Sequence, residues 1–184
     1  IYYWRGGTGT LNSSNTANLS TSSGGAGGAG PVTSADDLII DANSGGGTIT
    51  VSGTVDCKTF AASVGAAAVT ITGTSSDKIR VHGNAATVVS CSNLVTWGVA
   101  LFVELVYAGA TGTRTYSGPS SGSAFGLNIA VTAGSDTVSI TSRVLSLSFS
   151  GFTGTLSNGT RTLLGNLTLA AGMTVADGAG ITTV

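Results

Sequence analysis

His82 is the residue from which acid–base chemistry would have to start, because it is the only histidine among the 184 residues. A nucleophilic triad also needs a hydroxyl or thiol and a carboxylate that the fold brings to the imidazole, and no spacing in the sequence joins them. His82 lies in the alternating run Ile79–Gly83, where a period of two predicts an outward or corner position. We therefore expect no catalytic residues and no enzymatic activity.

Asp36 and Asp37 are a second candidate, because a pair of carboxylates can cleave a glycosidic bond. Adjacent residues on a strand point to opposite faces, however, and the segment Ser34–Asp37 is typical of a turn or cap. Asp41 and Asn43 add oxygens that suit calcium, but the chain lacks an Asp-x-Asp-x-Asp-Gly loop. A turn is the favoured interpretation of these acids.

The two cysteines, Cys57 and Cys91, each lie in an alternating segment. Burial as two small apolar side chains is the favoured interpretation, and a single disulfide is the alternative. Neither cysteine has partners spaced for a metal site. The glycine-rich tract Gly24–Gly30 lacks the Gly-Lys-Ser/Thr ending and the following helix of a phosphate loop. We expect neither a metal ion nor a cofactor.

The scarcity of charge limits the classes of partner. Charged residues make up 8% of the chain and the formal net charge is −1, whereas about 25% is usual for a soluble domain. No basic patch for nucleic acid is expected. The longest apolar run, Val99–Tyr107, is interrupted by Glu104 and is too short for a transmembrane helix. A surface of threonine, serine, glycine and alanine favours packing against copies of the chain or other subunits.

Strands must position these residues, and the clearest strand signal lies in Val144–Val175. Leu145, Leu147 and Phe149 share one parity, and a second alternating set follows the glycine break. That set comprises Leu163, Leu167 and Leu169. A period of two predicts half-buried strands, here five or six residues long and joined by glycine or asparagine corners.

A weaker copy of this pattern lies upstream. Val55–Phe60 aligns with Val144–Phe149, and Ile79–Asn84 aligns with Arg161–Asn166. An imperfect internal repeat of strand, corner and strand predicts the coils of a solenoid. Residues 98–142 depart from this pattern with longer strands. Their glycine-rich connections, Gly109–Gly112, Gly118–Gly122 and Gly134–Asp136, are interpreted as hairpin turns of an inserted antiparallel sheet.

The fold prediction is therefore all-β: a β-solenoid-like stack with an inserted antiparallel sheet. A β-sandwich or jelly roll is the alternative. We expect a cap segment and first solenoid part in residues 1–97, the inserted region in residues 98–142, and a return to the solenoid in residues 143–184.

Several segments carry a resemblance to known β-rich families. They are Trp4–Thr10, Asn18–Ser20, Pro31–Asp37, Cys57–Lys58, Phe149–Leu156, Gly165–Leu169 and Gly172–Met173. The chain resembles a group of tailed-phage particle proteins, and is also similar to the N-terminal part of autotransporter-like β-helix surface proteins. Leu11 and Leu19 stand where those families carry tryptophan.

The resemblance implies a non-enzymatic structural protein of a phage particle, either a capsid-decorating or a tail-associated subunit located in the virion. The alternative is a bacterial cell-surface adhesin or extracellular filament subunit. A carbohydrate-active β-helix enzyme is a third class, but it would need clustered acids that the sequence does not show.

Tyr2, Tyr3 and Trp4 are the candidate capping or assembly residues. Each aromatic ring can bury about 150–250 Å², and the open end of a solenoid needs a cover. We expect these rings to be buried against their own coil or a neighbouring subunit.

We predict that deletion of residues 1–10 lowers the melting temperature or abolishes assembly, because it removes this apolar surface. Thermal unfolding and sedimentation of the truncated chain measure both. Unchanged stability and assembly, together with solvent-exposed aromatic rings, would contradict the capping hypothesis.

Overall fold

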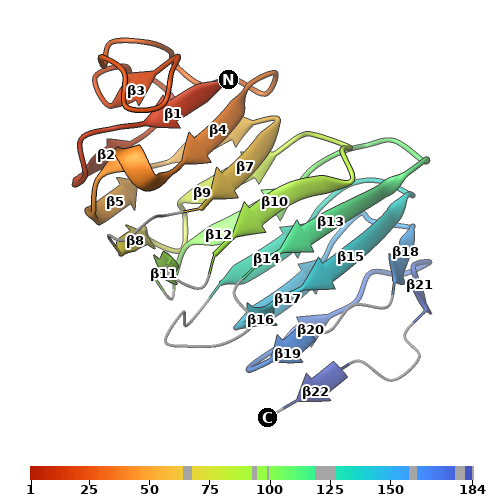
Figure 1. Cartoon of the computed structure of the whole chain (residues 1–184). Helices are drawn as coiled ribbons and strands as arrows, with labels where there is room; N and C mark the ends of the chain where they lie inside the picture. Colours follow the sequence, from red (N-terminus) through yellow and green to blue (C-terminus); the bar gives the residue numbers. More distant parts are fainter. Residues whose placement is uncertain are drawn as a thin grey trace.

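The computed structural model shows a stack of short β-strands that advance along one axis from the N-terminus to the C-terminus (Figure 1). It describes residues 1–63, 68–92, 95–98, 100–118, 127–157, 161–176 and 181–183. Apart from one 3₁₀ turn, η1 (Ala42–Ser44), the regular structure in this part of the chain is β. The all-β, solenoid-like prediction is confirmed. The β-sandwich alternative is wrong, because sandwich sheets are antiparallel and these are built from parallel pairs.

The described strands form four sheets, which we call sheets I to IV. Sheet I contains β3 (Leu19–Ser20), β1 (Tyr2–Trp4), β4 (Asp37–Ile40), β7 (Thr59–Ala62), β10 (Thr87–Cys91), β13 (Thr113–Ser117), β15 (Thr137–Thr141), β18 (Thr155–Ser157) and β21 (Thr174–Ala176). Sheet II contains β2 (Gly9–Leu11), β5 (Gly47–Val51), β8 (Val69–Thr72) and β11 (Val95–Trp97). Sheet III contains β6 (Thr54–Cys57), β9 (Lys78–Val81), β12 (Phe102–Leu105), β14 (Asn128–Val131), β17 (Ser146–Phe149) and β20 (Leu167–Thr168). Sheet IV contains β16 (Arg143–Val144), β19 (Arg161–Leu163) and β22 (Ile181–Thr183).

Each of the early coils contributes one strand to sheets I, II and III in turn, and the strands of sheet IV occur only in later coils. The strands β4, β5 and β6 form one coil, β7, β8 and β9 the next, and β10, β11 and β12 the one after. These coils pair in parallel and in register, so their strands hydrogen-bond to the coils before and after them. The register shifts between Thr87 and Val89, where β10 pairs with β13. Among the strand pairs of the described residues, β1 and β3 alone are antiparallel.

Sheet III shows most clearly how the sequence specifies a coil. Its strands repeat an apolar residue, a variable residue and a second apolar residue, as in Val55-Asp56-Cys57. The first apolar position aligns Val55 with Ile79, and the register continues through β12, β14 and β17. These apolar side chains are buried in one continuous core, while the variable position points outward, as a period of two requires.

The predicted antiparallel insertion is wrong. Within residues 98–142, β12 pairs in parallel with β9 and β14, and β13 pairs in parallel with β10 and β15. Side-chain alternation is the same in parallel and antiparallel strands, so the pattern could not give the direction of pairing. The glycine-rich segments taken for hairpin turns are corners, as far as the structure describes them; residues 119–126, which include part of the expected turn Gly118–Gly122, lie outside the described residues. The three-part division of the chain stays a prediction.

The proposed alignment of the two repeats is also corrected. Phe60 belongs to sheet I, whereas its suggested counterpart Phe149 belongs to sheet III. The structural equivalent of β6 is β17, so Cys57 corresponds to Phe149. The repeating unit is a single coil, much shorter than the separation between the two copies that we aligned.

Cys57 and Cys91 are buried free thiols, which confirms the favoured interpretation. They lie in different sheets, in β6 of sheet III and β10 of sheet I. Burial, with smaller contributions from Asp56 and Asp37, raises the pKa of the Cys57 thiol, and burial raises that of Cys91. Both side chains act as small core residues rather than as nucleophiles.

Arg114 and Asp136 form an ion pair inside the stack. The Arg114 side chain is 1% exposed, and its Nε and Nη2 each donate to an Asp136 oxygen at 2.7 Å. The guanidinium also lies 5.5 Å from the centre of the Tyr107 ring and 6.0 Å from that of Phe152. Gly134, with φ of 107°, leaves room for the pair, since a Cβ there would lie 2.9 Å from Arg114 Nη2.

We predict that Asp136→Ala lowers the free energy of unfolding by about 3–5 kcal/mol, because it leaves a buried guanidinium without its counter-ion. Chemical denaturation measures the loss. The double variant Arg114→Met, Asp136→Leu should be more stable than Asp136→Ala, since it removes both charges. Asp56→Ala, at a partly exposed pair, is the matched control and should cost about 0–1 kcal/mol; equal losses at the two sites would contradict the assignment.

Candidate functional site

Charged side chains gather at the outward positions of sheet III. Asp56 in β6, Arg80 in β9 and Glu104 in β12 are register partners on successive coils, and Arg80 and Glu104 are 24 positions apart in the sequence. Lys78 and His82 share the parity of Arg80, so they face the same side of the sheet. We call these five residues the charged row. On the following coils the aligned outward residues are uncharged: Ala130, Ser148 and Thr168.

Arg80 connects the two carboxylates of the charged row. Its Nε donates to Glu104 Oε2 at 2.9 Å, and its Nη1 lies 3.7 Å from Asp56 Oδ1. Lys78 Nζ lies 3.4 Å from the same Glu104 oxygen. Opposite charges therefore alternate across the three coils, and the row is close to electrically neutral.

The ionisation of Glu104 follows from these contacts. Burial alone raises the pKa of its carboxyl, but the hydrogen bond from Arg80 and the positive charges of Lys78 and Arg80 outweigh burial. The pKa of Glu104 is consequently lowered from its ordinary value of 4.5. At neutral pH this carboxylate is ionised, so it can accept hydrogen bonds but cannot act as a general acid.

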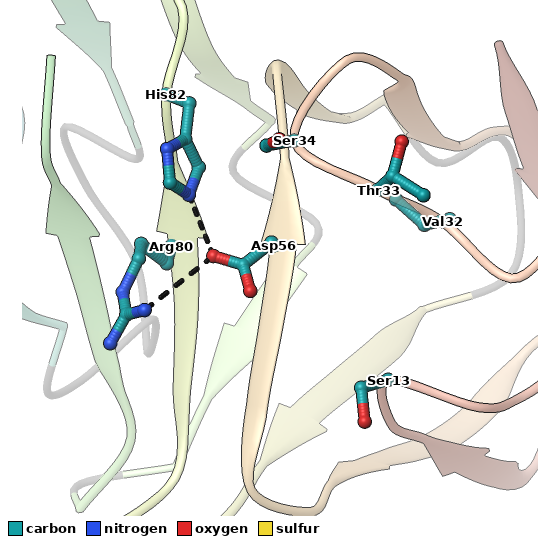
Figure 2. Close-up of a pocket in the computed structure, with 7 residues that line it drawn as sticks. All are labelled: Ser13, Val32, Thr33, Ser34, Asp56, Arg80 and His82. Atoms are coloured by element: carbon teal, nitrogen blue, oxygen red, sulfur yellow. Dashed lines mark hydrogen bonds and ion pairs between the residues drawn. The ribbon is translucent and has the colours of Figure 1, made fainter.

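His82 lies beside Asp56 at one end of the charged row. The ring Nε2 is 2.6 Å from Asp56 Oδ1, and both side chains are about one-third exposed. Figure 2 shows Arg80 and His82 reaching from one strand toward the same oxygen of Asp56, while the second carboxylate oxygen points away from both. The outward position expected for His82 is confirmed.

A surface pocket of about 440 Å³ opens next to this cluster. One wall consists of Asp56, Arg80 and His82, and the other consists of Ser13, Val32, Thr33 and Ser34 (Figure 2). The second wall comes from the segment between β2 and β4, which also carries β3 at the end of the stack.

The turn predicted at Ser34–Asp37 fixes this second wall. Asp36 Oδ2 accepts from the Thr33 backbone N–H at 3.1 Å and from the Thr33 hydroxyl at 2.6 Å. Asp37 instead accepts from Thr59 on the neighbouring strand at 2.7 Å. The two aspartates thus have separate structural roles, as expected for adjacent residues. Asp41 caps η1 by accepting from the Asn43 backbone N–H.

The pocket groups form a hydrogen-bonding surface rather than an assembled nucleophilic triad. Within the described part of the chain, neither Ser13 nor Ser34 is hydrogen-bonded to His82, whose Nε2 is engaged by Asp56. In Figure 2 the other ring nitrogen of His82 faces away from Ser34. A search of the described residues finds no group of three or more metal-ligating side chains.

Tyr2, Tyr3 and Trp4 lie apart from the pocket, in the first strand of sheet I. Trp4 is 1% exposed, and its indole N–H donates to the Gly7 carbonyl at 2.9 Å. Tyr2 and Tyr3 are half-buried and pair with β4. The rings are therefore part of the first coil, and β3 lies beyond them. Their capping or assembly role stays a prediction.

Comparisons of the chain with models of protein families, with characterised proteins and with solved structures yield no match. In the residues that the structure describes, no helix is long and apolar enough to cross a membrane.

Sequence reasoning missed Asp56, Arg80 and Glu104 as a group. The available signal was the recurrence of apolar-charged-apolar triplets at a spacing of one coil, in a chain that is only 8% charged. Recognising it requires the coil period, which our two-copy alignment did not supply. His82 was examined on its own, without the aspartate that the preceding coil places beside it.

We predict that Glu104→Gln lowers the melting temperature at about pH 7 and has less effect at about pH 3. The lowered pKa means that ionised Glu104 stabilises the folded state, and this contribution is lost as the pH falls below the ordinary value of 4.5 and through the folded-state value. Thermal unfolding at both pH values measures it. Ser148→Ala, at an uncharged outward position, should show no such pH dependence. A difference that grows on acidification would contradict the prediction.

Proposed function

We propose that the chain is a non-enzymatic structural protein of a phage particle, a capsid-decorating or tail-associated subunit. It acts through self-association and through contacts with neighbouring subunits. The assignment to a phage particle rests on the sequence resemblance, and a continuous core of in-register parallel coils suits a rigid structural part.

The observation that carries the assembly proposal is the apolar surface at one end of the stack. Leu167 is 37% exposed, Leu169 is 49% exposed and Val175 is 40% exposed. These residues lie in or next to β20 and β21, the terminal strands of sheets III and I. Exposed apolar side chains at a strand edge favour pairing with another chain. The same alternating pattern that buries Leu147 and Phe149 one coil earlier leaves these residues uncovered here.

The opposite end of the stack differs. There β3 pairs antiparallel with β1, and Leu19 and Trp4 are almost completely buried. Figure 1 shows β3 and its loops lying over the first coil.

A bacterial cell-surface adhesin or filament subunit is the alternative function, because the same coil architecture serves an extracellular scaffold. Mass spectrometry of purified phage particles tests the first proposal directly, as do flanking genes for capsid and tail proteins. A secretion system encoded beside the chain would favour the alternative.

We predict that the double variant Leu167→Lys, Leu169→Lys prevents self-association, because it places two charges in the apolar surface. Sedimentation velocity at increasing protein concentration measures the effect. Thr50→Lys, at an exposed outward position of β5, is the matched control and should associate like the unmodified chain. A chain that is monomeric at high concentration, or association that survives both lysines, would contradict the assembly proposal.

A further inference from the structure

We propose that the pocket between the charged row and residues Ser13–Ser34 binds a neutral carbohydrate. This site lies on the side of the stack, so the inference goes beyond the proposed assembly function and does not depend on it. It rests on the unused hydrogen-bonding groups, on the balance of charge and on the rigidity of both walls.

The pocket presents hydrogen-bonding groups that the protein itself does not use. Within the described part of the chain, Asp56 Oδ2, Arg80 Nη2 and the hydroxyls of Ser13 and Ser34 have no protein partner. Asp56 Oδ2 can only accept, the guanidinium can only donate, and each serine hydroxyl can do both. Donors and acceptors therefore stand on facing walls of the same pocket.

This mixture of groups selects the chemistry of the ligand. A hydroxyl both donates and accepts, so a ligand with neighbouring hydroxyls can satisfy Asp56 and Arg80 together. An anion would be attracted by Arg80 but repelled by the adjacent carboxylate of Asp56. A cation would be attracted by Asp56 but repelled by Arg80. Val32 adds an apolar contact for the C–H groups of a sugar ring. A neutral, hydroxyl-rich molecule fits these groups best.

Both walls are held in place before any ligand binds. Asp56 is fixed by His82 at 2.6 Å and lies 3.7 Å from Arg80, which is itself held by Glu104 at 2.9 Å. On the facing wall, the contacts from Thr33 to Asp36 fix the turn that carries Ser34. Groups that are already ordered lose little conformational entropy on binding, which favours affinity.

The dimensions of the site suit a short oligosaccharide. The pocket volume of about 440 Å³ falls in the range of about 300–1,000 Å³ that is usual for small-molecule sites. Outward residues on neighbouring strands of sheet III recur at about 4.8 Å. An extended sugar chain in the pocket could therefore continue along the charged row toward Glu104, which lies on the next strand, β12, and toward Lys78, which lies on β9 with Arg80.

The test is binding of neutral oligosaccharides of glucose, galactose, mannose and N-acetylglucosamine, measured by saturation-transfer NMR and calorimetry. An oligomer of galacturonic acid serves as the anionic comparison. We expect the unmodified chain to bind at least one neutral oligosaccharide in preference to the anionic one. We expect Asp56→Asn to weaken that binding roughly tenfold or more, since a hydrogen bond to a charged group is lost.

Two further variants separate binding from folding. Ser34→Ala removes a group from the facing wall and should also weaken binding, while Asp37→Asn, outside the pocket, should leave it unchanged. Circular dichroism verifies that each variant is folded. The proposal is overturned if no neutral oligosaccharide binds, if only the anionic oligomer binds, or if Asp56→Asn and Ser34→Ala bind like the unmodified chain. Sedimentation of the same samples reports assembly separately.

Discussion

Hydrogen bonding between successive coils is the constraint on which the rest of this structure depends. A parallel strand has no partner within its own coil, so its backbone groups are satisfied only by the coils on either side. Parallel stacking from β1 to β21 meets this requirement along sheet I, with one shift of register where β10 meets β13. As a consequence, the terminal strands of sheet I, β3 and β21, each pair with one strand only, whereas the strands between them pair on both sides.

The core follows from that stacking. Apolar residues at alternate positions fall above one another, as Val55, Ile79 and Val103 do in sheet III, and together they form one continuous cluster. The Arg114–Asp136 pair interrupts this apolar interior, and both its charges are almost fully buried. Such a pair contributes little net stability compared with apolar residues of the same size. Removing either partner alone is nevertheless strongly destabilising, because the other charge is then buried without a counter-ion.

The outward positions are free of the packing constraint, and they carry the chemistry. Stacking placed Asp56, Arg80 and Glu104 side by side although they are far apart in the sequence. The segment between β2 and β4 then folds over the first coil and supplies a facing wall. The same segment thus covers one end of the stack and forms part of the pocket. At the opposite end of the described stack, Leu167 and Leu169 are exposed.

Local patterns in the sequence determined the all-β class, the coil-like repetition, the burial of Trp4 and both cysteines, and the turn at Asp36. These features depend on side-chain alternation and on short-range hydrogen bonds, which neighbouring residues specify. The direction of pairing in residues 98–142, the length of the repeat and the meeting of Asp56 with His82 were decided only by the tertiary structure. Alternation is identical in parallel and antiparallel strands, and the pairing of one coil with the next depends on corner lengths that vary along the chain. The contacts of the pocket therefore arise from the stacking of coils, which no single stretch of sequence encodes.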